Sequence, residues 1–182
     1  MGVPTDARVE LVRGSRAEAH DALRTLVAEL AGVDDASVTI VRRCPDCGGP
    51  HGRPVVMDPP AARDIGVSLA HAGERHVVAA VHGARIGIDA ERRDAAPERL
   101  AALRALLPAA GTDPLRRWTR IEAVLKADGR GLRVEPAAVV LEQRADGLVA
   151  SVPGSGRRYR VHDLDLGAEL VVSLAIEGDR RV

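Results

Sequence analysis

The chain has 182 residues, 26 basic and 26 acidic side chains, a formal net charge of zero at pH 7 and 46% hydrophobic residues. That length suits one medium domain or two small halves with a real buried core, and the balanced charge gives no general reason to expect nucleic acid or an anionic membrane as the partner. With one Trp, one Tyr and no Phe, the chain is a poor candidate for a module that stacks bases on aromatic side chains.

Hydrophobicity and cysteine content indicate the compartment. No apolar run reaches the roughly 18 residues of a membrane span, and the N-terminal segment lacks the basic and apolar regions of a secretory signal. The two cysteines, Cys44 and Cys47, make no disulfide framework for a chain of this size. We therefore expect a cytoplasmic protein with no membrane partner.

Hydrophobic periodicity and turn residues predict one helix and several strands before the middle of the chain. Strand 9–13 leads to a helix that begins after Ser15, with Glu18 three residues on as in a capping box, and that stops at Gly32. The Cys-, Pro- and Gly-rich segment 44–60 reads as a loop. Further strands are expected at 37–41, 65–69, 77–81 and 85–89.

Two helices and a run of strands are expected in the rest of the chain. A helix at 97–107 is broken by Gly-Thr-Asp-Pro at 111–114, and another runs from about Leu115 to Gly129. The strands expected after it are 137–142, 148–152, 158–164 and 169–176.

Two pairs of segments repeat in the same order along the chain. Val33–Ile40 matches Val134–Leu141 at an offset of 101 residues, and Gly73–Val81 resembles Gly167–Ala175 at an offset of 94. Both members of the first pair follow a predicted helix that ends in Gly. The repeats therefore predict a duplicated helix-plus-sheet unit.

This duplication sets the expected architecture. The fold class is α+β, with two similar helix-plus-antiparallel-sheet halves, 1–83 and 84–182, related by pseudo-twofold symmetry. A functional site at the seam between the halves follows naturally, because ligand sites prefer such boundaries.

The first chemical signal is Gly87-Ile-Asp89-Ala-Glu91. Residues i and i+2 of a strand face the same way, so the two carboxylates project together from its end. Carboxylates held that close are costly unless a cation offsets their charge, and hard oxygen ligands of this kind suit Mg²⁺ completed by substrate phosphates. The plain alternative is two exposed carboxylates at a turn, with Arg92 and Arg93 as ion-pair partners.

The second signal lies on the predicted helix, where Trp118, Glu122 and Lys126 are spaced four residues apart along one face. Lys126 is the single lysine among 26 basic residues, which indicates a place where a compact ammonium is wanted rather than a planar guanidinium. Glu122 is then a candidate metal ligand, Lys126 a phosphate clamp and Trp118 a packing anchor. A surface Glu–Lys pair worth a few tenths of a kcal/mol, with chance survival of the lysine, stays open as the alternative.

Together these segments resemble the 4′-phosphopantetheinyl transferase superfamily, in its longer, monomeric (surfactin-type) branch, which is itself a duplicated α+β unit. The family's G-[IV]-D-x-E strand end stands here as Gly87–Glu91, and its W-[ST]-x-K-E-x-x-x-K-x-x-G-x-G-[LF] helix as Trp118–Leu132. A His-Gly-Lys-Pro turn and an S-H-[ST] stretch precede them in the family and stand here as His51–Pro54 and Ala70–Ala72. The four motifs keep the family's order.

The resemblance implies transfer of the phosphopantetheine arm of coenzyme A to a serine of an acyl or peptidyl carrier protein, with release of 3′,5′-ADP. Asp89, Glu91 and Glu122 would hold Mg²⁺ against the pyrophosphate. Glu122 would also help to deprotonate the serine, and Lys126 would stabilise or protonate the leaving phosphate. This inventory fits phosphoryl-type transfer, which needs positioning and charge neutralisation.

The resemblance also implies a monomer and a set of residues that bind coenzyme A. Residues away from the first helix would bind the phosphate end of coenzyme A: Arg53, His71, Asp89 and Lys126. Arg24 and Thr25 on the first helix would reach its adenylate end.

Departures from the family pattern keep a non-catalytic alternative open. Ile121 stands where the family has Lys, and Ala70 and Ala72 flank His71 where it has hydroxyl residues. Arg53 replaces a Lys, which keeps the charge but changes the geometry. The alternative is a protein on the same scaffold that binds coenzyme A or a carrier protein without transfer.

A weaker alternative is a zinc-knuckle interaction protein built around Cys44, Cys47 and His51. Structural zinc normally takes four ligands, and only these three candidates cluster, so a plain loop with two thiols is the favoured interpretation. The other histidines have no partner that the sequence identifies and are interpreted as surface or core residues: His20, His76, His82 and His162.

Overall fold

The computed structural model describes residues 7–42, 48–49, 51–107 and 113–178. Its first half holds a long helix, a three-stranded sheet and a two-stranded ribbon, and every paired strand is antiparallel to its neighbour. The elements of this half are β1 (Ala7–Arg13), α1 (Arg16–Ala31), β2 (Thr39–Arg42), β3 (Pro54–Asp58), β4 (Ile65–Ala72) and β5 (Arg75–His82).

The second half holds two helices and a five-stranded antiparallel sheet. Its elements are β6 (Ile86–Arg92), α2 (Pro97–Leu106), α3 (Pro114–Asp128), β7 (Val140–Arg144), β8 (Gly147–Ser151), β9 (Arg158–Leu164) and β10 (Leu170–Glu177). The expected α+β class is confirmed.

Local capping chemistry fixes the ends of α1 and α3. The Glu18 amide donates to Ser15 Oγ at 3.2 Å, and the Ser15 amide donates to Glu18 Oε2 at 2.6 Å, which completes the expected capping box. The helices stop at Gly32 (φ 65°) and Gly129 (φ 90°), where the left-handed backbone favours glycine.

The strand order of the first half recurs in the second. One sheet runs β1-β5-β4 and the other begins β6-β10-β9, while the β2-β3 ribbon has its counterpart in the neighbouring strands β7 and β8. The short 3₁₀ turns Asp35–Ser37 and Pro136–Ala138 lead into β2 and β7 at the same offset of 101 residues. The segments that repeat in the sequence therefore form matching structure.

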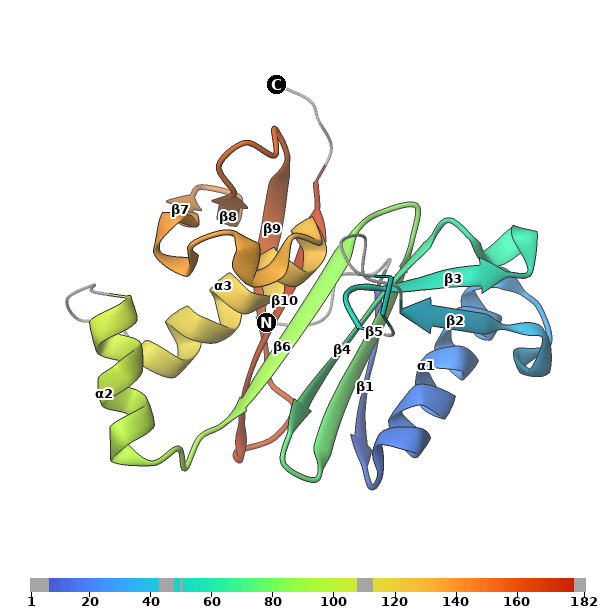
Figure 1. Cartoon of the computed structure of the whole chain (residues 1–182), viewed down its shortest axis with the longest axis horizontal. Helices are drawn as coiled ribbons and strands as arrows, with labels where there is room; N and C mark the ends of the chain where they lie inside the picture. The colour runs from blue at the N-terminus through green and yellow to red at the C-terminus, as the bar shows by residue number, and fades with distance from the viewer. Residues whose placement is uncertain (1–6, 43–47, 50, 108–112, 179–182) are drawn as a thin grey trace.

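Aliphatic side chains of both sheets meet in one core cluster, and each sheet carries a helix on its other face. Val77 points into the shared core, whereas Val78, one residue on, packs against α1. In the same way α3 packs on β6, β9 and β10, and α1 and α3 lie on opposite sides of the strands (Figure 1). At the seam, β4 and β6 lie side by side, and the Ile88 amide donates to Ser68 Oγ at 3.0 Å.

One expected element is wrong. The sequence predicts a loop over 44–60, whereas Pro54–Asp58 forms β3 and pairs with β2. Proline is tolerated at the first residue of a strand, so Pro- and Gly-rich composition concealed a short strand. Within the described ranges no helix is long and apolar enough to cross a membrane.

Candidate active site

Glycine at position 87 lets α3 lie directly on β6. A Cβ atom there would overlap the carbonyl oxygen of Ala123 and lie 2.5 Å from the amide nitrogen of Ala127, both on the backbone of α3. No side chain other than hydrogen fits this contact. The close approach brings Lys126, from the next turn of α3, to the end of β6.

Lys126 and Asp89 form the central contact of the site. The Lys126 ammonium donates to Asp89 Oδ1 at 2.7 Å and to the carbonyl oxygen of Ile88 at 2.9 Å. Asp89 is only 8% exposed, and this burial raises its pKa, against the opposing pull of Lys126. The two sequence signals, on β6 and on α3, therefore meet in one charged cluster.

Glu122 and Glu91 belong to the same cluster. Burial raises the pKa of Glu122, and the nearby charges of Asp89 and Glu91 raise it further. Glu91 Oε1 accepts a hydrogen bond of 2.7 Å from Arg99 of α2, whose guanidinium lies 5.2 Å from the ring centre of Trp118. The three predicted metal ligands thus act on one another electrostatically, and Arg99 and Lys126 each neutralise one of them.

The carboxylates suit a hard cation by their chemistry, although they are not gathered into a finished metal site. Among the described residues, no group of three or more His, Cys, Asp or Glu side chains is arranged to hold a metal ion. Asp89 and Glu91 are turned to Lys126 and Arg99. An all-oxygen set with mutual repulsion favours Mg²⁺ over softer metals, and Asp89, Glu91 and Glu122 are the residues that would hold it.

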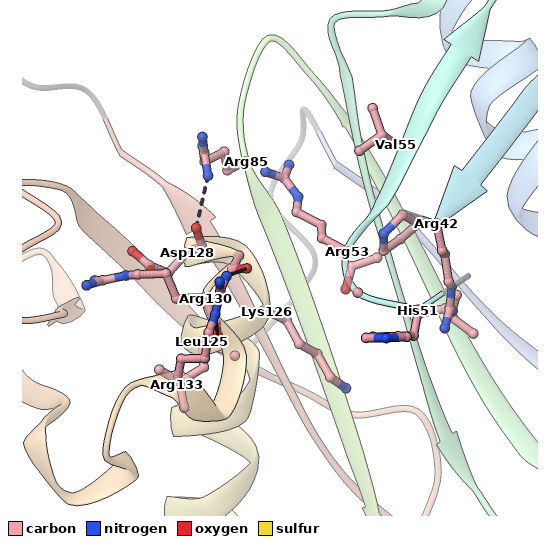
Figure 2. Close-up of a pocket in the computed structure, with 16 residues that line it drawn as sticks. Arg42, His51, Arg53, Val55, Arg85, Leu125, Lys126, Asp128, Arg130 and Arg133 are labelled. Atoms are coloured by element: carbon pink, nitrogen blue, oxygen red, sulfur yellow. Dashed lines mark hydrogen bonds and ion pairs between the residues drawn. The ribbon is translucent and has the colours of Figure 1, made fainter. Parts of the chain in front are cut away.

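A cavity of about 640 Å³ opens at the seam beside this cluster. Figure 2 shows His51 and Arg53 reaching in from the first half, and Arg42 lines the cavity from the same half. Arg130, just after α3, lines the other wall, where its guanidinium donates to Asp128 and to the carbonyl oxygen of Pro153. Lys126 lines it as well. Among the described residues, its charged and ionisable lining side chains are Arg42, His51, Arg53, Arg85, Lys126, Arg130 and Arg133, with Asp128 as the single carboxylate.

Several guanidinium groups of the cavity hold buried nitrogen atoms that have no hydrogen-bond partner in the described part of the chain. Nε of Arg42, Nε of Arg53 and Nη2 of Arg130 are buried in this state. Burial lowers the pKa of Arg53, and the charge of Arg85 lowers it further. Since buried donors and crowded positive charges are costly without acceptors, the chemistry of this lining suits an anion.

Asp128 fixes one wall of the cavity and does not compete with such an anion. It accepts hydrogen bonds from Arg130 Nε at 2.5 Å and from the Tyr159 hydroxyl at 3.0 Å, and its main-chain oxygen accepts one from Arg85 at 2.9 Å. Burial raises the pKa of Asp128, but the hydrogen bonds from Arg130 and Tyr159 outweigh this effect and hold the pKa below its usual range. The carboxylate is therefore ionised and committed to its own partners.

The predicted coenzyme A residues divide into two groups. Arg53 and Lys126 line the cavity, and Asp89 bonds to Lys126. Arg24 and Thr25 lie on α1, where Arg24 pairs with Asp21 at 3.3 Å and Thr25 Oγ1 donates to the Asp21 carbonyl, also at 3.3 Å.

The remaining predicted residues near this site fall in different places. The structure does not bring Arg24 and Thr25 into the cavity lining. His71 bonds to His76 across the β4–β5 pair. Of the zinc candidates, His51 lines the cavity, whereas Cys44 and Cys47 lie outside the described residues.

The departures from the family pattern fall on core positions. Ile121 is fully buried, and Ala70 and Ala72 are 2% and 7% exposed within the apolar core. A charged or hydroxyl side chain at these positions would face aliphatic neighbours instead of the cavity. The substitutions therefore remove no polar group from the cavity described above.

Sequence reasoning missed most of the arginines that build the site. Arg42, Arg85, Arg99, Arg130 and Arg133 carry no motif, and in a chain where nearly every basic residue is Arg, a functional arginine is indistinguishable from a surface one. The one local signal was the pair of glycines that flank Arg130 after α3. No protein-family model matches the chain, and no curated protein matches it.

Proposed function

We propose that this chain is a Mg²⁺-dependent 4′-phosphopantetheinyl transferase that moves the arm of coenzyme A onto a serine of an acyl or peptidyl carrier protein and releases 3′,5′-ADP. One observation carries the proposal. Lys126 lines the basic cavity and at the same time bonds to Asp89 in the carboxylate cluster. A phosphate-rich ligand in the cavity would therefore present its phosphates to the cluster.

The ligand class follows from charge and size. Six cationic side chains and one committed carboxylate line about 640 Å³, a volume within the range of pockets that hold cofactor-sized molecules. Coenzyme A carries a pyrophosphate and a 3′-phosphate, which are strong acceptors for the unpartnered guanidinium donors of Arg42, Arg53 and Arg130.

The proposed reaction is a displacement at phosphorus. The serine Oγ of the carrier attacks the pantetheine-bearing phosphorus, the new O–P bond forms, and the bond to the bridging oxygen of 3′,5′-ADP breaks. Glu122 accepts the serine proton, a role that suits a carboxylate whose pKa is raised. Lys126 donates to the phosphate oxygens as negative charge develops on the leaving group.

Mg²⁺ held by Asp89, Glu91 and Glu122 would neutralise the pyrophosphate charge. For Asp89 and Glu91 this requires their carboxylate oxygens to accept a metal in addition to their present partners, Lys126 and Arg99. Burial and mutual repulsion favour this exchange, because both leave the cluster short of positive charge.

The architecture proposed with this function is a duplicated unit, 1–83 and 84–182, with pseudo-twofold symmetry between the halves. The repeated strand order and the matching turns at Asp35–Ser37 and Pro136–Ala138 support it. The cavity then lies at the seam, with Arg53 from one half and Lys126 from the other. We further propose that the protein is a monomer, since one chain supplies both walls of the cavity. We also propose that it is cytoplasmic.

The test is the intact mass of an apo carrier protein after incubation with this chain, coenzyme A and Mg²⁺, beside a sample with EDTA. A metal-dependent gain of roughly 340 Da, the mass of one phosphopantetheine, is the expected result. No gain across acyl and peptidyl carriers, with coenzyme A binding intact, would overturn the proposal.

One observation favours a second candidate, a coenzyme A-binding or carrier-binding protein without transfer activity. Glu91 is held by Arg99, and the described residues contain no assembled metal site. The two candidates differ in their metal requirement. The transferase requires the metal for transfer and loses activity with EDTA, whereas the binding protein transfers nothing and takes up coenzyme A equally well with and without EDTA.

A further inference from the structure

A pair of histidines joins β4 to β5 beside the candidate active site. His71 and His76 are directly opposite in the register of the two strands, and their Nδ1 atoms are 2.5 Å apart with the rings at 86°. His76 is 3% exposed, and its Nε2 lies 2.9 Å from the carbonyl oxygen of Gly14. The sequence assigned no role to His76.

The hydrogen bonds fix the tautomer of each neutral ring. A carbonyl oxygen can only accept, so His76 Nε2 carries the hydrogen that faces Gly14. In the neutral ring, Nδ1 of His76 is then an acceptor, and the short contact requires His71 Nδ1 to be the donor. The remaining nitrogen of His71, Nε2, is left with a lone pair and can accept a proton without breaking the chain of bonds.

The surroundings keep His71 neutral in the free protein. Burial lowers its pKa to about 4, with further lowering by His76 of β5, Arg16 of α1, Arg42 of β2 and Lys126 of α3. The charges that act most strongly on the ring are therefore all basic groups from the elements around it. Arg42 and Lys126 line the basic cavity, and so does Leu69, which lies two residues before His71 on the same face of β4. His71 itself is outside that lining and borders it along the strand.

From this geometry we infer that His76 is a positioning residue that holds His71 by Nδ1, so that Nε2 takes up a proton from solvent when a phosphate of the ligand binds. The Nδ1–H bond to His76 is kept, a new Nε2–H bond forms, and that N–H donates to the phosphate. A dianionic phosphate beside the ring offsets the basic side chains that keep it neutral. The inference rests on the proposed function for the identity of the ligand, coenzyme A.

Its first test needs no ligand. Nitrogen chemical shifts of the imidazoles in the free protein near neutral pH should show His71 protonated at Nδ1 and His76 protonated at Nε2. The reverse tautomer at either ring would overturn the inference and would leave the proposed transferase activity unaffected.

The second test measures proton uptake when coenzyme A binds, by calorimetry at pH 5 and at pH 7 in buffers of different ionisation enthalpy. Because the pKa of the free His71 ring is about 4, the wild-type protein should take up more of a proton at pH 5 than at pH 7 and should bind coenzyme A more tightly as the pH falls from 7 toward 5. Pantetheine, which carries no phosphate, should take up none. Binding heats of coenzyme A that are independent of the buffer would overturn the inference.

Variants separate positioning from folding. His76→Leu, or His76→Gln if the first is unstable, should weaken coenzyme A binding about tenfold, the scale of one lost buried hydrogen bond, and reduce the proton uptake. The matched control is His82→Gln on the same strand, an exposed histidine paired with Asp64, which should change neither. Unchanged proton uptake and affinity in the His76 variants would overturn the assignment, whereas proton-coupled binding without transfer would overturn only the proposed function.

Discussion

The Lys126 ammonium lies 2.7 Å from Asp89 Oδ1 and 2.9 Å from the carbonyl oxygen of Ile88, so one compact cation ties α3 to the end of β6. A guanidinium is planar and longer than an ammonium and does not reproduce two such converging bonds at this spacing. These two contacts are a physical reason to expect lysine at this position in a chain that otherwise uses arginine.

The first prediction concerns Lys126→Arg. The change keeps the positive charge of the cavity, so coenzyme A should bind nearly as well. The donor to the developing phosphate charge is displaced, so transfer should slow by about 10²-fold, the effect of losing one such donor. Steady-state transfer rates and coenzyme A titrations separate the two effects.

The control for this change is the reverse exchange on the same helix, Arg120→Lys. Arg120 binds Asp163 with two hydrogen bonds, of 3.0 Å and 2.6 Å, away from the cavity. The Arg120→Lys variant should transfer at the rate of the wild-type protein. Equal transfer rates for Lys126→Arg and the wild-type protein would show that the lysine has no special role.

The second prediction concerns Gly87→Ala. Because a methyl group would overlap the backbone of α3 at Ala123 and Ala127, the helix must move away from β6. We expect a loss of about 3 kcal/mol in the free energy of unfolding, the upper end of overpacking costs, together with slower transfer as Lys126 moves from Asp89. Denaturant unfolding measures the first effect.

Gly178→Ala is the matched control for Gly87→Ala. A Cβ at position 178 meets no atom closer than 3.9 Å, and its backbone is not left-handed, so its stability should be close to that of the wild-type protein. If Gly87→Ala were as stable as this control, the close packing of α3 on β6 would be wrong.

The third prediction concerns Glu122 and its dependence on pH. Burial, and then the charge of Asp89, raise its pKa above the ordinary value of 4.5, so the folded protein favours the protonated form. Its contribution to stability is fully present below that value and is lost as the pH rises through the raised pKa. Above the raised pKa, the ionised form of Glu122 therefore destabilises the fold.

Glu122→Gln removes this penalty. Its melting temperature should exceed that of the wild-type protein at pH 7, and the difference should shrink as the pH falls below 4.5. Transfer should fall by about 10²–10⁴-fold, the usual contribution of general acid–base catalysis. Added Mg²⁺ should raise the melting temperature of the wild-type protein more than that of the variant. A variant that is less stable than the wild-type protein at pH 7 would contradict this account.

The elements of the fold were predictable because their signals are local. Ser15 and Glu18 cap α1, Gly32 and Gly129 end their helices in the left-handed region, and alternating apolar residues mark the strands. The strand β3 was missed because Pro54 and its Gly-rich approach carry turn signals, and only the pairing with β2 makes the segment a strand.

The candidate site was predictable only where residue type and spacing were unusual. A single lysine and two carboxylates at i and i+2 identify Lys126, Asp89 and Glu91 without any contact map. The cavity arginines depend on long-range packing, since Arg53 and Arg130 are 77 positions apart in the sequence and share one lining. His76 was passed over because its partners, His71 and Gly14, become neighbours only through strand register.

The last prediction concerns Tyr159, the one tyrosine of the chain. Burial, and then the charge of Asp128, raise its pKa to about 12, against about 10 in an unfolded chain. The stability that this group contributes is present below the unfolded value and is lost as the pH rises toward the folded one. An ultraviolet pH titration should therefore show no tyrosinate until near pH 12, or until alkaline unfolding exposes the ring.

Tyr159→Phe removes the hydroxyl that bonds to the buried Asp128 at 3.0 Å. Asp128 Oδ2 then loses a hydrogen-bond donor, which should lower the free energy of unfolding by about 1–2 kcal/mol. The change should also weaken coenzyme A binding, because Asp128 holds Arg130 in the cavity wall. Arg158→Ala, at the exposed neighbouring position, should change neither. Titration of Tyr159 near pH 10 in the folded protein would show that the hydroxyl is neither buried nor bonded to Asp128. A Phe variant as stable as the wild-type protein would show that the hydroxyl does not support the wall.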